Sequence, residues 1–205
     1  MEKVELNKEI KLTPHFTLGE LTKTKYVTAD GNIPSRVVIE NLKRICENWL
    51  EDLRYSYNRL YVHSGVRPQS IVVAGVRPQS KVAGDCTLAP DPGAAPDPGA
   101  AAELGAAAAA RKEVPIVINS GYRSPEVNRL AGGAANSNHL SGCAVDIRCA
   151  GKEQMIRYAS ILLDIADGSK QEYDELLLEQ HGSVCWLHFA VRPKENRRII
   201  RFLRV

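Results

Sequence analysis

The sequence predicts an α+β fold in which a small antiparallel sheet packs against helices. Two observations support this class: an apolar stripe with helical spacing in the first part of the chain, and short alternating apolar runs in the last part. A segment of very different composition separates them. We expect one domain formed by residues 1–63 and 113–205, with residues 64–112 inserted into it.

Length and composition limit the possibilities further. The chain has 205 residues, enough for one full hydrophobic core. Its net charge is +3 with both signs intermixed, so we expect no nucleic-acid partner. The basic cluster at 192–204 is better explained as a solvated terminal strand than as a polyanion site. The five cysteines lack CxxC spacing, which disfavours a disulfide framework. We also expect the protein to be a monomer.

The beginning of the sequence carries no secretory signal. The first six residues lack an apolar core, and no run approaches the roughly 18 apolar residues that a membrane span needs. We therefore expect synthesis in the cytoplasm without a signal peptide and without a membrane span.

Two helices are expected before the insertion. Thr17 and Glu20 form a capping-box pattern that starts a short helix. A longer helix starts at Pro34 and Ser35, and its apolar positions recur every three or four residues, as expected for a face turned to the core: Val38, Leu42, Ile45, Trp49 and Leu53.

The segment 64–112 contains short duplications. GVRPQS occurs at 65–70 and 75–80, and PDPGAA at 90–95 and 96–101. These units are too short for structural repeats, which need about 20 residues or more. We interpret the segment as a low-complexity, mostly disordered insertion. A specific binding loop is less favoured because large apolar anchors are almost absent.

Regular structure is expected again after the insertion. Gly121 ends the first strand there, and Ser124 and Pro125 are typical of a helix start. A turn at 181–183 makes the last two strands a hairpin. The sequence predicts strands at 114–118, 144–148, 173–179 and 185–191, and helices from 125 to about 132 and from 152 to 166.

Three residues in this second part could share a metal ion. His139 and Asp146 would be roughly 23 Å apart in an extended chain, so the chain must double back, and Gly142 is placed to allow it. Strand alternation lets Asp146 and His188 face each other if their strands are neighbours. Two imidazoles and one carboxylate leave an open position on zinc, as in catalytic sites. Taken singly, each histidine is better explained as a surface, capping or core residue.

Two further residues could complete an active site. Glu179 follows an apolar strand, where burial would raise the pKa of a carboxyl group toward that of a general base. Arg123 stands in a loop and could clamp a substrate carboxylate. The alternatives are a solvated hairpin residue for Glu179 and a structural ion pair for Arg123.

Three ordered motifs resemble the zinc D-Ala-D-Ala carboxypeptidase family of peptidoglycan peptidases, whose metal-site architecture is shared by D,D-dipeptidases, phage endolysins and the hedgehog domain. The motifs are SGYRSP at 120–125, SNHLSGCAVDI at 137–147 and WLHF at 186–189, and HFTLGEL at 15–21 is similar to the opening of one subgroup. The resemblance covers about residues 13–62 and 113–203.

The resemblance implies a zinc ion held by His139, Asp146 and His188, and a peptidoglycan peptide as substrate. It also implies that Arg123 binds a substrate carboxylate and that Ser137 assists; we place Tyr122 and Trp186 in the substrate site as well. The family commonly has its catalytic acid three residues before the last histidine, where this chain has Cys185. The resembling subgroup instead supplies a glutamate from the preceding strand, which corresponds to Glu179.

The first hypothesis is therefore a zinc peptidase, either a D-Ala-D-Ala carboxypeptidase or an endolysin-like endopeptidase, that acts on the cell wall after release or export. The second is a hedgehog-like module that holds zinc and catalyses nothing. A structural protein without a metal is the third.

Overall fold

The computed structural model describes residues 7, 9–63 and 112–204. The chain divides into two units, Met1–Tyr57 with Val114–Val205, and Asn58–Glu113. In the second unit the described helix is η2, Asn58–His63. The predicted insertion falls almost entirely outside the described residues, so its disorder stays a prediction.

The N-terminal helices follow the sequence pattern. In α1, Leu18–Leu21, the Thr17 hydroxyl accepts the Glu20 backbone N–H at 3.3 Å and the Glu20 carboxylate accepts the Thr17 N–H at 2.9 Å, so the capping box is confirmed. The helices α2, Arg36–Ile45, η1, Cys46–Leu50, and α3, Glu51–Tyr57, follow one another without a break. All five residues of the predicted apolar stripe are buried.

Five strands form one sheet in the order β1-β2-β4-β3-β5. They are β1, Ile118–Ser120, β2, Ala144–Cys149, β3, Glu175–His181, β4, Val184–Ala190, and β5, Ile199–Arg204. The predicted hairpin of the last two expected strands is confirmed as β3 and β4, which pair antiparallel around Gly182 and Ser183.

The sheet differs from the expected antiparallel one in a single pairing, because β5 runs parallel to β3. The end of β4 and the start of β5 both pair with Glu175, the first residue of β3. After β4 the chain therefore enters β5 at the end of the sheet where β3 also begins, so the two strands must run in the same direction. The basic C-terminal segment does form a strand, at the sheet edge.

The first predicted strand is displaced to Ile118–Ser120. Pro115 has no backbone N–H to donate to a neighbouring strand. Pairing with β2 starts only where the Val117 carbonyl accepts the Arg148 N–H at 2.8 Å. The strand consequently ends directly before the loop that carries Arg123.

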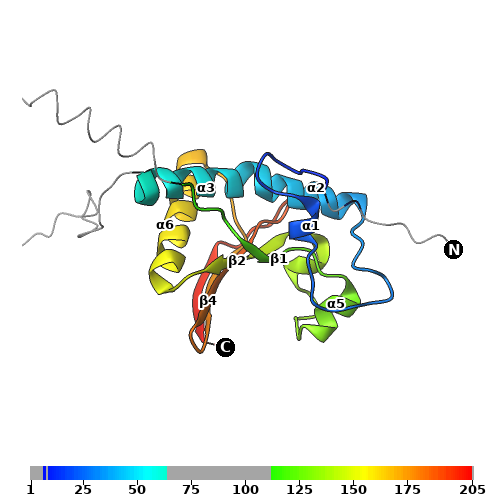
Figure 1. Ribbon diagram of the computed structural model, residues 1–205. Helices are drawn as coiled ribbons and strands as arrows, with labels where there is room; N and C mark the ends of the chain where they lie inside the picture. Colours follow the sequence, from blue (N-terminus) through cyan, green and yellow to red (C-terminus); the bar gives the residue numbers. More distant parts are fainter. Residues whose placement is uncertain (1–6, 8, 64–111, 205) are drawn as a thin grey trace, which may run out of the picture. The chain divides into compact units, whose positions relative to one another are not determined.

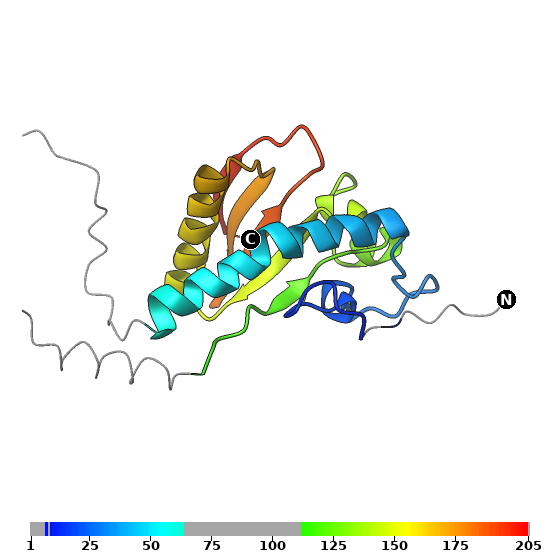
Figure 2. The same cartoon turned by 90° about the horizontal axis from the view of Figure 1, so that it is seen from above.

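Helices cover one face of the sheet. Strand alternation directs six buried residues to that face: Val145, Ile147, Leu176, Leu178, Leu187 and Phe189. Trp49 meets the edge of the Phe189 ring with centroids 5.0 Å apart. The helix α6, Lys152–Ser169, packs beside α3, where Tyr57 and Tyr158 make a similar contact at 4.8 Å (Figures 1 and 2). The other face of β2, β3 and β4 carries Asp146, His188, Glu175 and Glu179 and is called the polar face below.

In the described part of the chain, no helix combines the length and the apolar composition needed to span a membrane.

Candidate metal centre

A short turn delivers His139 to the polar face of the sheet. The 3₁₀ helix η3, Asn138–Ser141, begins at Ser137, whose hydroxyl accepts the His139 N–H at 3.3 Å. Gly142 ends it with φ +68°, and a Cβ there would lie 2.7 Å from the Val38 carbonyl oxygen. Only glycine fits this reversal without strain. The chain therefore doubles back into β2 at the predicted residue.

Three donor atoms converge between η3, β2 and β4. Asp146 and His188 are direct partners across β2 and β4. Asp146 Oδ1 lies 2.9 Å from His188 Nδ1 and 3.2 Å from His139 Nε2, and the two nitrogens are 3.2 Å apart. The side chains are largely shielded, with 2 to 9% of each residue exposed. Three donor atoms this close together could hold one small cation.

The outer nitrogens of both imidazoles have acceptors. His139 Nδ1 lies 2.5 Å from the Gly121 carbonyl oxygen, which can only accept, so Nδ1 donates there and Nε2 is the ring nitrogen that faces the cluster. His188 Nε2 lies 3.5 Å from Glu175 Oε2. Acceptors of this kind orient imidazoles that bind metals.

The pKa values of Asp146 and His188 are shifted by the groups that lie close to them in the cluster. Burial raises the pKa of Asp146, but the two histidines outweigh it and hold that pKa well below its usual range. Burial lowers the pKa of His188, yet hydrogen bonds to Asp146 and Glu175 dominate and raise it to about 9. Without a metal, the Asp146 carboxylate is thus stabilised by protonated His188, whose positive charge takes the role of a cation.

A cavity of about 420 Å³ opens beside the cluster. Of the residues predicted for the site, it is lined by His139, Asp146, His188, Glu179, Arg123, Ser137 and Trp186. Tyr122 is not among its described lining residues: it is buried, and its backbone N–H donates to the Leu21 carbonyl at 2.7 Å. Tyr122 thus joins the N-terminal segment to the loop before α5, Pro125–Leu130.

Glu179 shares the polar face of the sheet with the cluster. It pairs with Trp186, while its neighbour on that face, Leu177, pairs with His188. Burial, as the largest influence, raises the pKa of Glu179, and His188 opposes it. A raised pKa makes a carboxyl group at a cavity wall a better proton acceptor than an ordinary glutamate.

Arg123 joins the cavity to the cluster. Its Nε donates to the Ser120 hydroxyl at 2.8 Å, and Nη2 forms an ion pair with Asp146 Oδ2. Because Oδ1 faces the two histidines, Asp146 contacts the guanidinium and the imidazoles through different oxygens. These contacts use two of the N–H groups of Arg123 and fix the direction of its side chain.

The side chain of Cys185 does not face the cavity, although the resembling family commonly has its catalytic acid at this position. It is three residues before His188 in a regular strand, so its side chain points to the helix-covered face. It is 3% exposed and pairs with Cys149 of β2. The departure noted in the sequence is thus accompanied by a geometry in which residue 185 cannot reach the cavity.

Sequence reasoning missed a supporting network. Asn138 Nδ2 donates to Asp174 Oδ2 at 2.8 Å and to Glu175 Oε2 at 3.1 Å, and Arg197 pairs with both carboxylates. The two-residue period counted back from Glu179 could have placed Glu175 on the polar face. No sequence signal indicates the Gly121 carbonyl, since any residue has one.

A comparison with models of protein families found a match. A family model described as Peptidase M15 matches residues 80–167, a range that contains Arg123, His139 and Asp146 and ends before His188. No curated protein matches the chain. The match indicates a metallopeptidase, and the family predicted from the motifs is the one whose model this chain matches, Peptidase M15.

Proposed function

We propose that the protein is a zinc-dependent peptidase that hydrolyses amide bonds next to D-amino acids in peptidoglycan peptides, as a D-Ala-D-Ala carboxypeptidase or an endolysin-like endopeptidase. The convergence of His139 Nε2, His188 Nδ1 and Asp146 Oδ1 at a cavity wall carries the proposal. The Peptidase M15 match supports it.

The donor set suits zinc. Zinc accepts imidazole nitrogen and carboxylate oxygen, and three protein ligands leave a coordination position for catalysis. When bound, the ion would polarise a peptide carbonyl and lower the pKa of a water molecule. The acceptors beside His139 Nδ1 and His188 Nε2 would keep the other ring nitrogen of each histidine directed toward the ion.

The protein's own groups divide the remaining work. Glu179 takes a proton from the attacking water and returns it to the leaving amine, for which its raised pKa is suited. Arg123 orients the substrate through a carboxylate. Trp186, opposite Glu179, offers an apolar wall, and Ser137 fixes the turn that carries His139.

One observation favours the second candidate, a zinc-holding module without catalysis. Cys185 takes the position of the family's acid and is directed away from the cavity. The two functions differ in whether Glu179 moves protons. We also propose that the protein acts as a monomer and meets the wall after release or export.

Mass spectrometry of purified peptidoglycan peptides, incubated with zinc-loaded protein, tests the proposal. Wild-type protein should release a product with a defined mass loss. Glu179→Gln should retain zinc and lose at least about 100-fold in rate, as for removal of a general base. Glu47→Gln, an exposed glutamate paired with Lys43 on the N-terminal helix, is the matched control and should behave as wild type. Stoichiometric zinc without product would favour the non-catalytic module.

A further inference from the structure

A second cleft adjoins the metal cavity. Its volume is about 510 Å³, and it shares Arg123 and Ala131 with the first. Its walls are the loop after α1, the edge of β1 and one side of α5. The shared residues make the two hollows neighbours, so a ligand longer than one residue could occupy both.

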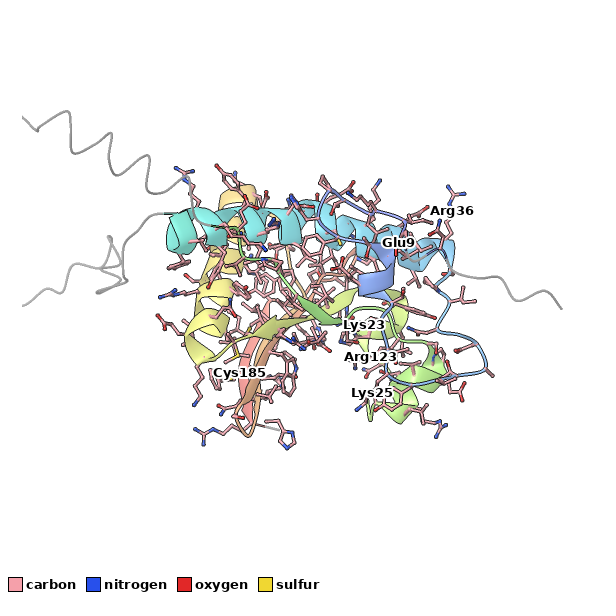
Figure 3. All side chains as sticks on the ribbon, in the orientation of Figure 1. Glu9, Lys23, Lys25, Arg36, Arg123 and Cys185 are labelled. Atoms are coloured by element: carbon pink, nitrogen blue, oxygen red, sulfur yellow. The ribbon has the colours of Figure 1, made fainter. Side chains whose placement is uncertain are left out.

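The charge of this cleft has one sign. Four cationic side chains line it, from Lys23, Lys25, Arg123 and Arg148, and its described lining contains no aspartate or glutamate. Arg123 is already paired with Asp146 of the adjoining cavity, so Lys23, Lys25 and Arg148 supply the excess positive charge. Figure 3 shows Lys23, Arg123 and Lys25 close to one another below α1. Arg148 Nε is anchored on the Asn119 side-chain oxygen at 3.2 Å. A cleft whose charged groups are all positive attracts anionic ligands.

The segment that carries the two lysines is anchored at Thr22, directly before Lys23. Asn32 Nδ2 donates to the Thr22 carbonyl at 2.8 Å and to the Tyr122 carbonyl at 3.3 Å, and Asn32 Oδ1 accepts the Ser124 N–H at 2.7 Å. Asn32 is 2% exposed. The backbone directly before Lys23 is thus tied to the loop of Arg123, and at that position binding requires little further ordering of the main chain.

We propose that this basic cleft, lined by Lys23, Lys25 and Arg148, binds a carboxylate-bearing stretch of the peptide substrate while the scissile bond lies in the metal cavity. The inference rests on the proposed function and deepens it, since it makes an anionic peptide the preferred substrate. The cleft's size suits a few residues of a peptide. Its neutral walls, which include Tyr26, Val117 and Val127, suit a peptide better than a bare phosphate chain.

Calorimetric titration with two peptides tests the inference independently of turnover. One is a peptidoglycan stem pentapeptide with free carboxylates, and the other is the same peptide with its internal carboxylates converted to amides. Lys23→Gln/Lys25→Gln should weaken binding of the first about three- to ten-fold and of the second less than two-fold, since exposed ion pairs contribute little each. The difference should shrink as salt rises.

A matched variant controls for the change in net charge. Lys152→Gln/Lys194→Gln removes two exposed lysines outside both cavities and should bind both peptides as wild type does. Zinc content and melting temperature should be the same in all three proteins. Tripolyphosphate serves as a further probe: binding of it, without any preference for the free-carboxylate peptide, would overturn the proposal in favour of a phosphate site.

The outcome is separable from that of the proposed function. Charge-dependent peptide binding without product would support the cleft and contradict hydrolysis. Product formation with equal KM for both peptides, unchanged in Lys23→Gln/Lys25→Gln, would support hydrolysis and contradict the cleft. We expect Lys23→Gln/Lys25→Gln to raise the KM for the free-carboxylate peptide alone, with kcat unchanged.

Discussion

His188 stands between two carboxylates. Its Nδ1 lies 2.9 Å from Asp146 Oδ1 on β2, and its Nε2 lies 3.5 Å from Glu175 Oε2 on β3. The central strand β4 thus places one imidazole between acids from both of its neighbours. Asp146 and His188 are both candidate metal ligands, and Glu175 lies at the other nitrogen of the His188 ring.

Zinc binding should release a proton at neutral pH. In metal-free protein the pKa of His188 is raised from 6.5 to about 9, so at pH 7 a cation must displace the proton on this imidazole. The same shift stabilises the metal-free fold fully below pH 6.5, and the stabilisation is lost as pH rises through about 9. Calorimetry of zinc binding in two buffers of different ionisation enthalpy measures the release, and zinc affinity should rise with pH up to about 9. A binding enthalpy that is the same in both buffers would mean that no proton is exchanged and would contradict this prediction.

Glu175→Ala should weaken zinc binding by about 10- to 100-fold, the usual effect of removing the acceptor behind a metal-binding histidine. Glu175→Gln keeps an acceptor oxygen and should recover most of the affinity. Glu172→Ala, which removes an exposed glutamate paired with Arg198 at 3.5 Å, is the control. Competition with a chelating dye gives the affinities. Equal affinities for Glu175→Ala and Glu172→Ala would show that Glu175 does not support His188.

Two glycine substitutions should act in opposite directions. A Cβ on Gly121 would lie 2.3 Å from the Leu21 carbonyl oxygen, so Gly121→Ala should destabilise the fold and displace the carbonyl that orients His139. At Gly168, in α6, a Cβ would meet nothing within 4 Å, and Gly168→Ala should stabilise by about 0.5 to 1 kcal/mol. Denaturant unfolding measures both. A stable Gly121→Ala variant with unchanged zinc affinity would be evidence against the close packing.

An acid at position 185, where the resembling family commonly has its catalytic acid, should not restore the activity that is lost with Glu179. Cys185→Asp would put a carboxylate on the helix-covered face at a position that is 3% exposed, at a cost of several kcal/mol if it stays charged. The double variant Glu179→Gln/Cys185→Asp should therefore remain inactive and melt at a lower temperature than Glu179→Gln. Cys185→Ala is the control for loss of the thiol. Recovery of turnover would mean that residue 185 can reach the cavity.

Properties that depend on local periodicity could be predicted from the sequence. The apolar stripe from Val38 to Leu53, the reversal at Gly142 and the shared face of Asp146 and His188 each follow from side-chain spacing or from the backbone freedom of one residue. The extended run at 114–118 was displaced because Pro115 cannot donate to a neighbouring strand.

The tertiary structure decided which distant residues meet. Whether β5 lies antiparallel or parallel to its neighbour depends on the path of the chain after β4, and no residue in β5 encodes it. Glu175 behind His188, and Lys23 and Lys25 beside Arg123, are brought together by strand pairing and by the packing of Leu21 against Gly121. Side-chain period is a local property, whereas such contacts depend on the position of the whole backbone. The sequence therefore indicated the candidate triad of His139, Asp146 and His188, and the fold determined what surrounds it.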